Sequence, residues 1–113
     1  MVDEYIIGKH ERNSPEADVA ILEEIRREIR PGGAANVALN LKILGIDCLL
    51  VGVIGDDEAG NQLKSMLDEE NILYEFVVDA SRPTTTKKRY VDTDYNQFLR
   101  VDRELARELD SKC

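Results

Sequence analysis

The feature that most constrains the fold of this chain is a pair of glycines placed between a proline and a helical segment. Pro31-Gly32-Gly33 precedes residues 34–44, in which Val37, Leu41 and Leu44 recur at the i, i+4, i+7 spacing of one helix face. A glycine follows this segment and is a typical helix stop. Ala34 and Ala38 fall on the adjoining face, and the pattern predicts a packed helix that begins directly after a glycine loop.

The residues after this helix predict a second strand and a second helix. Cys48–Ile54 is an apolar run interrupted only by a glycine, which is typical of a strand buried on both faces. Asp56 or Asp57 then caps a helix that runs to about Glu70, and Leu63, Met66 and Leu67 are expected to face inward. Further short strands are expected at Tyr5–Ile7, Val19–Leu22, Glu75–Val78, Thr84–Val91 and Gln97–Val101. This order of elements predicts an α/β fold.

Three segments are harder to assign. Gly8 is expected to end the first strand and to lead into a polar stretch, Lys9–Pro15. Glu23–Arg30 has isoleucines four residues apart, as in a helix, but its alternating charges suit an exposed strand equally well. From Arg103 onward the sequence resembles the start of a helix.

Length and charge narrow the classes of protein. The 113 residues suit one small domain. The net charge of −8, with basic residues interleaved among acidic ones, argues against a nucleic-acid partner. No apolar run reaches the ~18 residues of a membrane span, and the N-terminus lacks a signal-peptide pattern, so we expect a cytoplasmic protein without a membrane partner.

The glycine pair is the strongest local candidate for a binding site. Gly32 and Gly33 allow close approach of a ligand to the backbone, and the N–H groups of the helix start suit an anion or a polyol, although a tight turn explains the pair equally well. Asn36, in the first turn, either faces a ligand or is a capping or solvent-facing amide. Asp3 either accepts hydrogen bonds from sugar hydroxyls or is an exposed acid.

A basic cluster occurs in a segment expected to be a strand. Period-2 alternation places Lys87 and Arg89 on one face and Lys88 on the other. Two cations on one face suit a phosphate, whereas an exposed strand also carries such charges to prevent edge pairing. The residues alone therefore indicate an α/β domain with a candidate pocket for a sugar or a phosphate.

Several segments, taken together, resemble a known family. Pro31-Gly32-Gly33-Ala34-Ala35-Asn36-Val37-Ala38 resembles the N-terminal sugar-binding motif of the ribokinase (PfkB) carbohydrate kinases, and residues 51–60 resemble the strand–helix segment that follows it. More narrowly, residues 12–17, 30–36, 82–89 and 97–102 resemble the heptose-7-phosphate kinase branch, which is the kinase half of the bifunctional lipopolysaccharide heptose enzyme.

This resemblance implies a fold, a site and a reaction. The fold would be the N-terminal part of a doubly wound sheet with a small β lid, with lid strands near 5–22 and 84–101 and the core near 31–78. Asp3, Gly32, Gly33 and Asn36 would hold sugar hydroxyls, and the pair Lys87 and Arg89 would lie near the sugar phosphate. The family transfers the γ-phosphate of ATP, assisted by Mg²⁺, to the anomeric hydroxyl. Its members often form homodimers through the lid.

One departure from the family pattern limits the activity expected of this chain. The family's catalytic aspartate belongs to a late G-x-G-D motif, which these 113 residues lack, so residues 1–113 correspond to roughly the first third of a kinase domain. We therefore expect the sugar site without the catalytic base, and no turnover. The alternatives are a kinase of another sugar or nucleoside, and a non-catalytic truncated interaction module.

Overall fold

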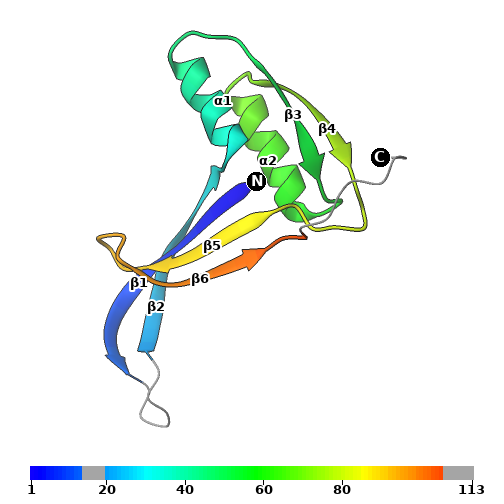
Figure 1. The fold of residues 1–113 in the computed structure, drawn as a ribbon. Helices are drawn as coiled ribbons and strands as arrows, with labels where there is room; N and C mark the ends of the chain where they lie inside the picture. Colours follow the sequence, from blue (N-terminus) through cyan, green and yellow to red (C-terminus); the bar gives the residue numbers. More distant parts are fainter. Residues whose placement is uncertain (14–19, 106–113) are drawn as a thin grey trace.

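The computed structural model describes residues 1–13 and 20–105. Within them the chain forms β1 (Val2–Asn13), β2 (Ala20–Pro31), α1 (Ala34–Ile43), β3 (Leu49–Ile54), α2 (Glu58–Glu69), β4 (Leu73–Val78), β5 (Thr86–Val91) and β6 (Gln97–Arg103). Figure 1 shows these elements as two groups, because the helices lie with β3 and β4 while the other strands project away from them. No helix in the described part of the chain is long and apolar enough to cross a membrane.

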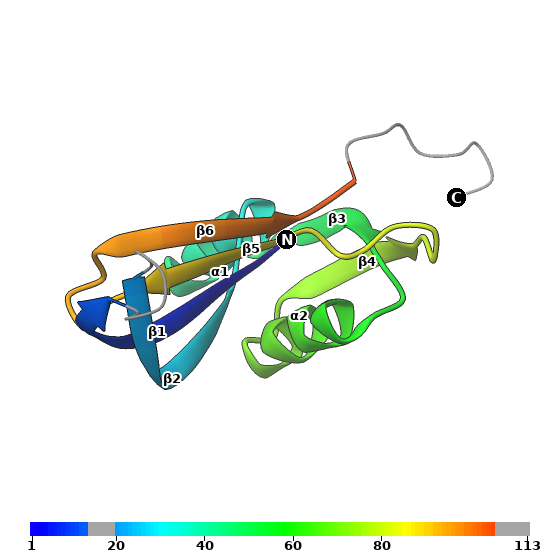
Figure 2. The same ribbon diagram turned by 90° about the horizontal axis from the view of Figure 1, so that it is seen from below.

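Four strands form the larger sheet, in the order β2-β1-β5-β6 (Figure 2). β1 is antiparallel to β2 and parallel to β5, and β6 is antiparallel to β5. The expectation that Gly8 ends the first strand is wrong, because β2 continues to pair with β1 as far as Asn13. Gly8 instead lies at a register shift, where a Cβ would overlap the carbonyl of Glu23. Backbone pairing with β2 thus overrides the polar composition of residues 9–13.

The ambiguous segment Glu23–Arg30 is a strand and forms most of β2. Its pairing with β1 satisfies the backbone groups that a helix would have satisfied internally. The helix expected from Arg103 does not begin there, because β6 extends through that residue. Expectations for residues 14–19 and 106–113 lie outside the described residues.

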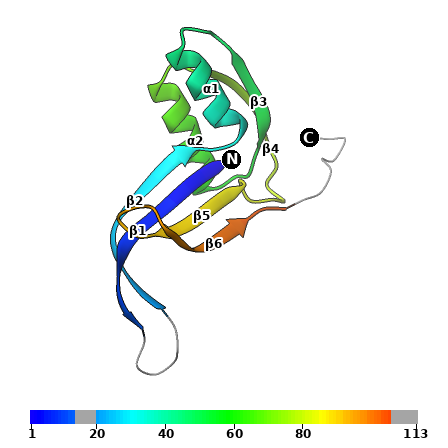
Figure 3. The same ribbon diagram turned by 60° about the vertical axis from the view of Figure 1, so that its left-hand side comes forward.

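The second group packs both helices on one face of the parallel pair β3–β4, as Figures 1 and 3 show. The inward side chains expected for α2 are confirmed, since Leu63 and Leu67 are buried and Met66 is partly buried against them. The hydrophobic core consists of Val2, Ala35, Ala38, Ile54, Leu63, Leu67 and Ile72. Because Val2 begins β1, this core also anchors the larger sheet to the helices.

The opposite face of β3–β4 is open. Val51 and Leu73 expose 65% and 69% of their surface, so the expected strand buried on both faces is covered on one face only. The strand itself was expected and begins one residue late, at Leu49. A parallel pair normally has helices on both faces, and both helices of the described residues lie on the same one.

The buried face of α1 differs from the expected one. Val37 and Leu44 are 56% and 74% exposed, whereas Ala35 and Ala38 are buried at 3% and 4%. Small residues allow the helix backbone to approach its neighbours closely, and α1 contacts β2 and β3. The i, i+4, i+7 spacing therefore identified the helix, but of the three spaced side chains only Leu41 is partly buried, and the packed side includes Ala38 of the adjoining face.

A cluster of hydrogen bonds joins the end of β3 to the segment before β5. Asp57 caps α2 by accepting from the Gly60 N–H at 2.9 Å, and it also accepts from the Thr84 N–H at 2.9 Å and the Thr84 hydroxyl at 2.6 Å. The Gly55 N–H donates to the Thr84 hydroxyl. Burial acts to raise the pKa of Asp57, but the hydrogen bonds from Thr84 and Gly60 prevail and lower it. The turn after β3 is thus a structural junction.

Candidate functional site

The two faces of the larger sheet carry different residues. Asp3 is paired with Arg30 of β2 and Lys87 of β5, and Lys87 is paired with Asp102 of β6. Residues paired directly across strands share a face, so these four form one row across the sheet. We call this side the Asp3 face and the other, which carries Glu4 and Lys88, the Glu4 face. The expected separation of Lys87 and Arg89 from Lys88 is confirmed.

The Asp3 face is rich in positive charge although the chain is acidic. Up to the register shift after Ile7, the strand registers place five cations and three acids on it: Arg26, Arg30, Lys87, Arg89 and Arg100, with Asp3, Glu28 and Asp102. The face therefore carries two net positive charges, since five minus three is two, in a chain of net charge −8. Such a local excess of cations favours an anionic ligand.

Two ion pairs on this face involve three of the predicted site residues. The Arg89 guanidinium lies 3.2 Å from the Asp3 carboxylate, with both side chains 21% exposed. The Lys87 ammonium lies 3.5 Å from Asp102. The structure thus brings Asp3, Lys87 and Arg89 together from segments more than 80 residues apart. A carboxylate that accepts hydroxyl hydrogen bonds stands beside cations that suit a phosphate.

The glycine pair lies at one end of the same face. A Cβ on Gly32 would come within 2.9 Å of the Asp3 carboxylate, so the absence of a side chain there makes room for that group. Gly33 has φ +56°, a backbone conformation that favours glycine, and its carbonyl accepts from the Asn36 N–H at 3.1 Å. Both interpretations of the pair are therefore compatible with the geometry. Gly33 adopts the positive φ that the turn requires, and Gly32 leaves space beside the Asp3 carboxylate.

Asn36 is less firmly connected to this group. Its side chain is exposed in the first turn of α1 and has no hydrogen-bond partner among residues 1–13 and 20–105. The side chain does not cap the helix, because the cap position is Gly33. Of the six predicted site residues, the structure thus joins Asp3, Gly32, Lys87 and Arg89 by contact, and places Gly33 and Asn36 next to them along the chain.

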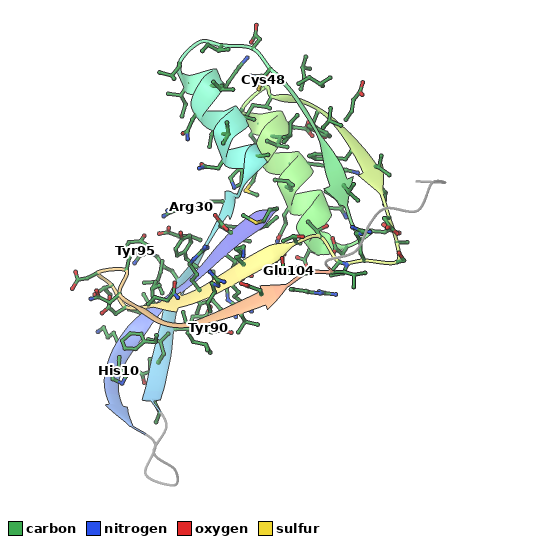
Figure 4. The ribbon with its side chains drawn as sticks, in the orientation of Figure 1. His10, Arg30, Cys48, Tyr90, Tyr95 and Glu104 are labelled. Carbon is green, nitrogen blue, oxygen red and sulfur yellow. The ribbon has the colours of Figure 1, made fainter. Side chains whose placement is uncertain are left out.

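An aromatic cluster on the same face was not predicted. Tyr95, at φ +63° in the β5–β6 turn, donates its hydroxyl to Glu28 at 2.8 Å and packs edge-on against Tyr5 at 5.9 Å. The Arg30 guanidinium lies 4.8 Å from the Tyr5 ring centre and 5.8 Å from that of Tyr95. Figure 4 shows Arg30 from β2 and Tyr95 from the turn at the same side of the sheet.

Sequence reasoning missed Arg30 for an identifiable reason. Its position beside Asp3 follows from the antiparallel register of β1 and β2, which brings together residues 27 positions apart. Choosing the strand interpretation of residues 23–30 would have placed Arg26, Glu28 and Arg30 on one face. Tyr95 gave no comparable signal, because its place depends on the turn between β5 and β6.

A cavity lies on the opposite face of the sheet. It has a volume of about 520 Å³ and is lined by Glu4, Arg27, Lys88 and Arg103 from the sheet and by Glu58 and Gln62 from α2, among others. Arg27 is already paired with Glu4 and Glu24. Acids and cations alternate around this cavity, so it lacks the charge excess of the Asp3 face.

The residues present do not make a metal site. Within residues 1–13 and 20–105, no group of three or more His, Cys, Asp or Glu side chains converges as ligands. Asp3 and Asp102 are each engaged by a cation of the same face.

The fold defines the class of protein. The chain is similar to a carbohydrate kinase from Agrobacterium tumefaciens, with a TM-score of 0.68 and 18% identity over 89% of this chain and 32% of that one. A ribokinase from Cryptococcus neoformans, solved in complex with ADP, gives a TM-score of 0.66 at 23% identity, covering 97% of this chain and 34% of that one. The fold is ribokinase-like, as expected.

The family follows from the sequence. Residues 2–113 match the model of the pfkB family carbohydrate kinases, and the chain belongs to that family. It is 48% identical over 113 residues to the "Bifunctional protein HldE" of Azorhizobium caulinodans, covering 98% of this chain and 23% of that protein. It is 45% identical to the "D-beta-D-heptose 7-phosphate kinase" of Bordetella bronchiseptica, covering 92% of this chain and 33% of that protein. The chain thus spans a fifth to a third of the length of these relatives.

Proposed function

We propose that this chain is the sugar-binding part of an ATP-dependent kinase that phosphorylates heptose 7-phosphate at its anomeric hydroxyl, in the synthesis of lipopolysaccharide heptose precursors. The observation that carries the proposal is the Asp3 face, where a carboxylate beside a glycine loop is flanked by cations in an acidic chain. The names of the relatives support the choice of a heptose phosphate.

In this proposal each predicted residue has one task. Asp3 accepts hydrogen bonds from sugar hydroxyls, Gly32 and Gly33 let the sugar approach the start of α1, and Asn36 adds an amide contact. Lys87 and Arg89 attract the phosphate of the substrate. The larger sheet acts as a lid over the bound sugar.

Binding of heptose 7-phosphate to the 113-residue protein, measured by calorimetry or NMR titration, tests this assignment. We expect Asp3→Asn to weaken binding about tenfold or more, because a charge-assisted hydrogen bond contributes roughly 1.5–3 kcal/mol. Glu4→Gln is the matched control, since Glu4 is the next residue and points to the other face. Equal losses in both variants, or tighter binding of ribose or adenosine than of the heptose phosphate, would contradict the assignment.

The phosphoryl transfer itself is proposed for the complete enzyme. ATP and Mg²⁺ would supply the phosphoryl group and assist its transfer there, and the catalytic base would come from a G-x-G-D motif, which residues 1–113 lack. We therefore expect the purified 113-residue protein to give no ATP-dependent phosphorylation of heptose 7-phosphate. Detectable transfer would overturn this part of the proposal.

An interaction role is the second candidate, and exposed side chains on an outer strand favour it. On β6, Phe98, Leu99 and Val101 are 46%, 56% and 46% exposed, and an outer strand can pair with another chain. A homodimer formed through the larger sheet would cover them. Analytical ultracentrifugation tests this, and we expect Leu99→Lys to shift any dimer toward monomer. A concentration-independent monomer would exclude the homodimer.

A further inference from the structure

Arg30, like Arg26 and Arg100, is a cation of the Asp3 face to which the proposed function gives no task. It is the cross-strand partner of Asp3 and lies two residues before Gly32 in the sequence. We propose that Arg30 is the specificity-determining residue that distinguishes a phosphorylated sugar from an unphosphorylated one. This inference rests on the proposed function of the same site and names the side chain that reads the phosphate.

The other two central cations are already engaged by carboxylates. Arg89 is paired with Asp3 at 3.2 Å and Lys87 with Asp102 at 3.5 Å, and all four side chains are between 21% and 25% exposed. Their charges are largely balanced before a ligand arrives. If Asp3 holds sugar hydroxyls, Arg89 remains beside it as its counter-ion, so the phosphate needs another strong donor.

Arg30 has the exposure and the orientation of such a donor. Its side chain is 52% exposed, about twice the value for Lys87 or Arg89. The rings of Tyr5 and Tyr95, at 4.8 and 5.8 Å, hold the guanidinium by cation–π contact. A guanidinium presents five N–H donors in a planar fork that fits phosphate oxygens in pairs. Arg30 is therefore oriented in advance, with donors free for a ligand.

The present partner of Arg30 can release it without being left unpaired. Glu28 accepts from Arg30, but it also accepts from the Tyr95 hydroxyl at 2.8 Å and from Arg26 at 3.4 Å. A sugar phosphate carries a charge of about −1.5 to −2 near neutral pH and competes well with a single carboxylate. The exchange of Glu28 for phosphate thus keeps every charge on this face paired.

The experiment compares heptose 7-phosphate with unphosphorylated heptose in binding to the 113-residue protein. We expect the wild type to prefer the phosphorylated sugar, and Arg30→Gln to weaken binding of heptose 7-phosphate about tenfold or more while changing heptose binding less than twofold. Arg30→Lys keeps the charge without the planar fork, so we expect it to recover only part of the loss.

The control is Arg27→Gln. Arg27 lies on the same strand, is 51% exposed and is also paired with glutamates, but it faces the cavity of the Glu4 face. We expect it to leave both affinities unchanged, and thermal unfolding checks that each variant is folded.

The outcomes separate the two proposals. An unchanged preference in Arg30→Gln, or an equal loss in Arg27→Gln, overturns the role of Arg30 and leaves the proposed function standing. A wild-type protein that binds neither sugar overturns the proposed function and, with it, this inference.

Discussion

At the scale of single residues, the site depends on the space left by Gly32. A methyl group there would lie 2.9 Å from both Cγ and Oδ1 of Asp3, which is closer than these atoms can approach. The carboxylate is the end of a flexible side chain, so we expect it to move rather than the backbone. Gly32→Ala should therefore impair the site more than the fold.

The prediction for Gly32→Ala is a loss of heptose 7-phosphate affinity of about tenfold or more, with a change in unfolding free energy of about 1 kcal/mol or less. Gly52→Ala is the control, because a Cβ there would meet only the Phe76 ring at 3.8 Å, an ordinary contact. Calorimetry and thermal unfolding measure the two quantities. A large loss of stability with unchanged affinity per folded molecule would show that Gly32 serves the turn alone.

Asp57 carries a prediction about acid stability. Because its pKa is lowered in the folded protein, its contribution to stability is complete above the pKa of the unfolded chain, near 4, and is lost as the pH falls further. We expect Asp57→Asn to lower the unfolding free energy by about 1–2 kcal/mol at pH 7, and the gap from wild type to narrow below pH 4.

Denaturant unfolding at several pH values between 7 and 3 measures this gap. Asp56→Asn is the control, since Asp56 is adjacent and exposed, and we expect it to change stability by less than about 0.5 kcal/mol. A gap between wild type and Asp57→Asn that is constant down to pH 3 would exclude this role of Asp57.

At the scale of elements, α1 shows what periodicity can and cannot predict. The helix was predicted with nearly correct bounds, but Val37 is exposed while Ala35 and Ala38 are buried, and Leu39 is partly buried against the core. Periodicity measures which residues share a face. It does not say how close the helix comes to its neighbours, and here close packing of backbones selects Ala35 and Ala38.

This packing predicts opposite effects for neighbouring positions in α1. Ala38→Leu inserts a large side chain into the core and should cost about 1–3 kcal/mol, whereas Val37→Ser, at a 56% exposed position, should cost about 0.5 kcal/mol or less. Denaturant unfolding of both variants tests the assignment. A large loss of unfolding free energy in Val37→Ser, with little loss in Ala38→Leu, would show that the Val37 side of α1 is the packed one.

At the scale of the whole molecule, the chain is extended and leaves one sheet face open. Its radius of gyration is 16.7 Å and its extents are 51 × 35 × 18 Å, whereas a compact chain of this length has a radius near 13 Å. The larger sheet projects from the helical part (Figure 3). The open face of β3–β4 carries Leu49, Val51 and Leu73, each more than half exposed.

We expect this open face to make the 113-residue protein self-associate, because exposed contiguous apolar surface is removed from water by contact. The double variant Val51→Thr and Leu73→Thr replaces two apolar side chains with threonine, which is polar and compatible with a strand. We expect it to shift sedimentation toward the monomer. Ile43→Gln, at an exposed apolar position on α1, is the control. Unchanged association in the double variant would exclude this face as the contact surface.

The local elements and the chemical groups they carry could be predicted from the amino-acid sequence. Apolar periodicity and turn residues predicted both helices and located most strands, and the motif around Gly32 and Gly33 pointed to the family that the comparisons show. Alternation alone placed Lys87 and Arg89 on one face of β5. These features depend on neighbours within a few residues, which the sequence contains directly.

The contacts between distant segments could be established from the three-dimensional fold alone. The pairing of β1 with β2 and β5 fixed the length of β1, turned residues 23–30 into a strand, and placed Arg30 beside Asp3. The open face of β3–β4 likewise depends on which elements are present to cover it. Strand register and helix packing are set by backbone hydrogen bonds and close contacts between residues far apart in the chain. Local sequence patterns do not specify which distant residues make these contacts.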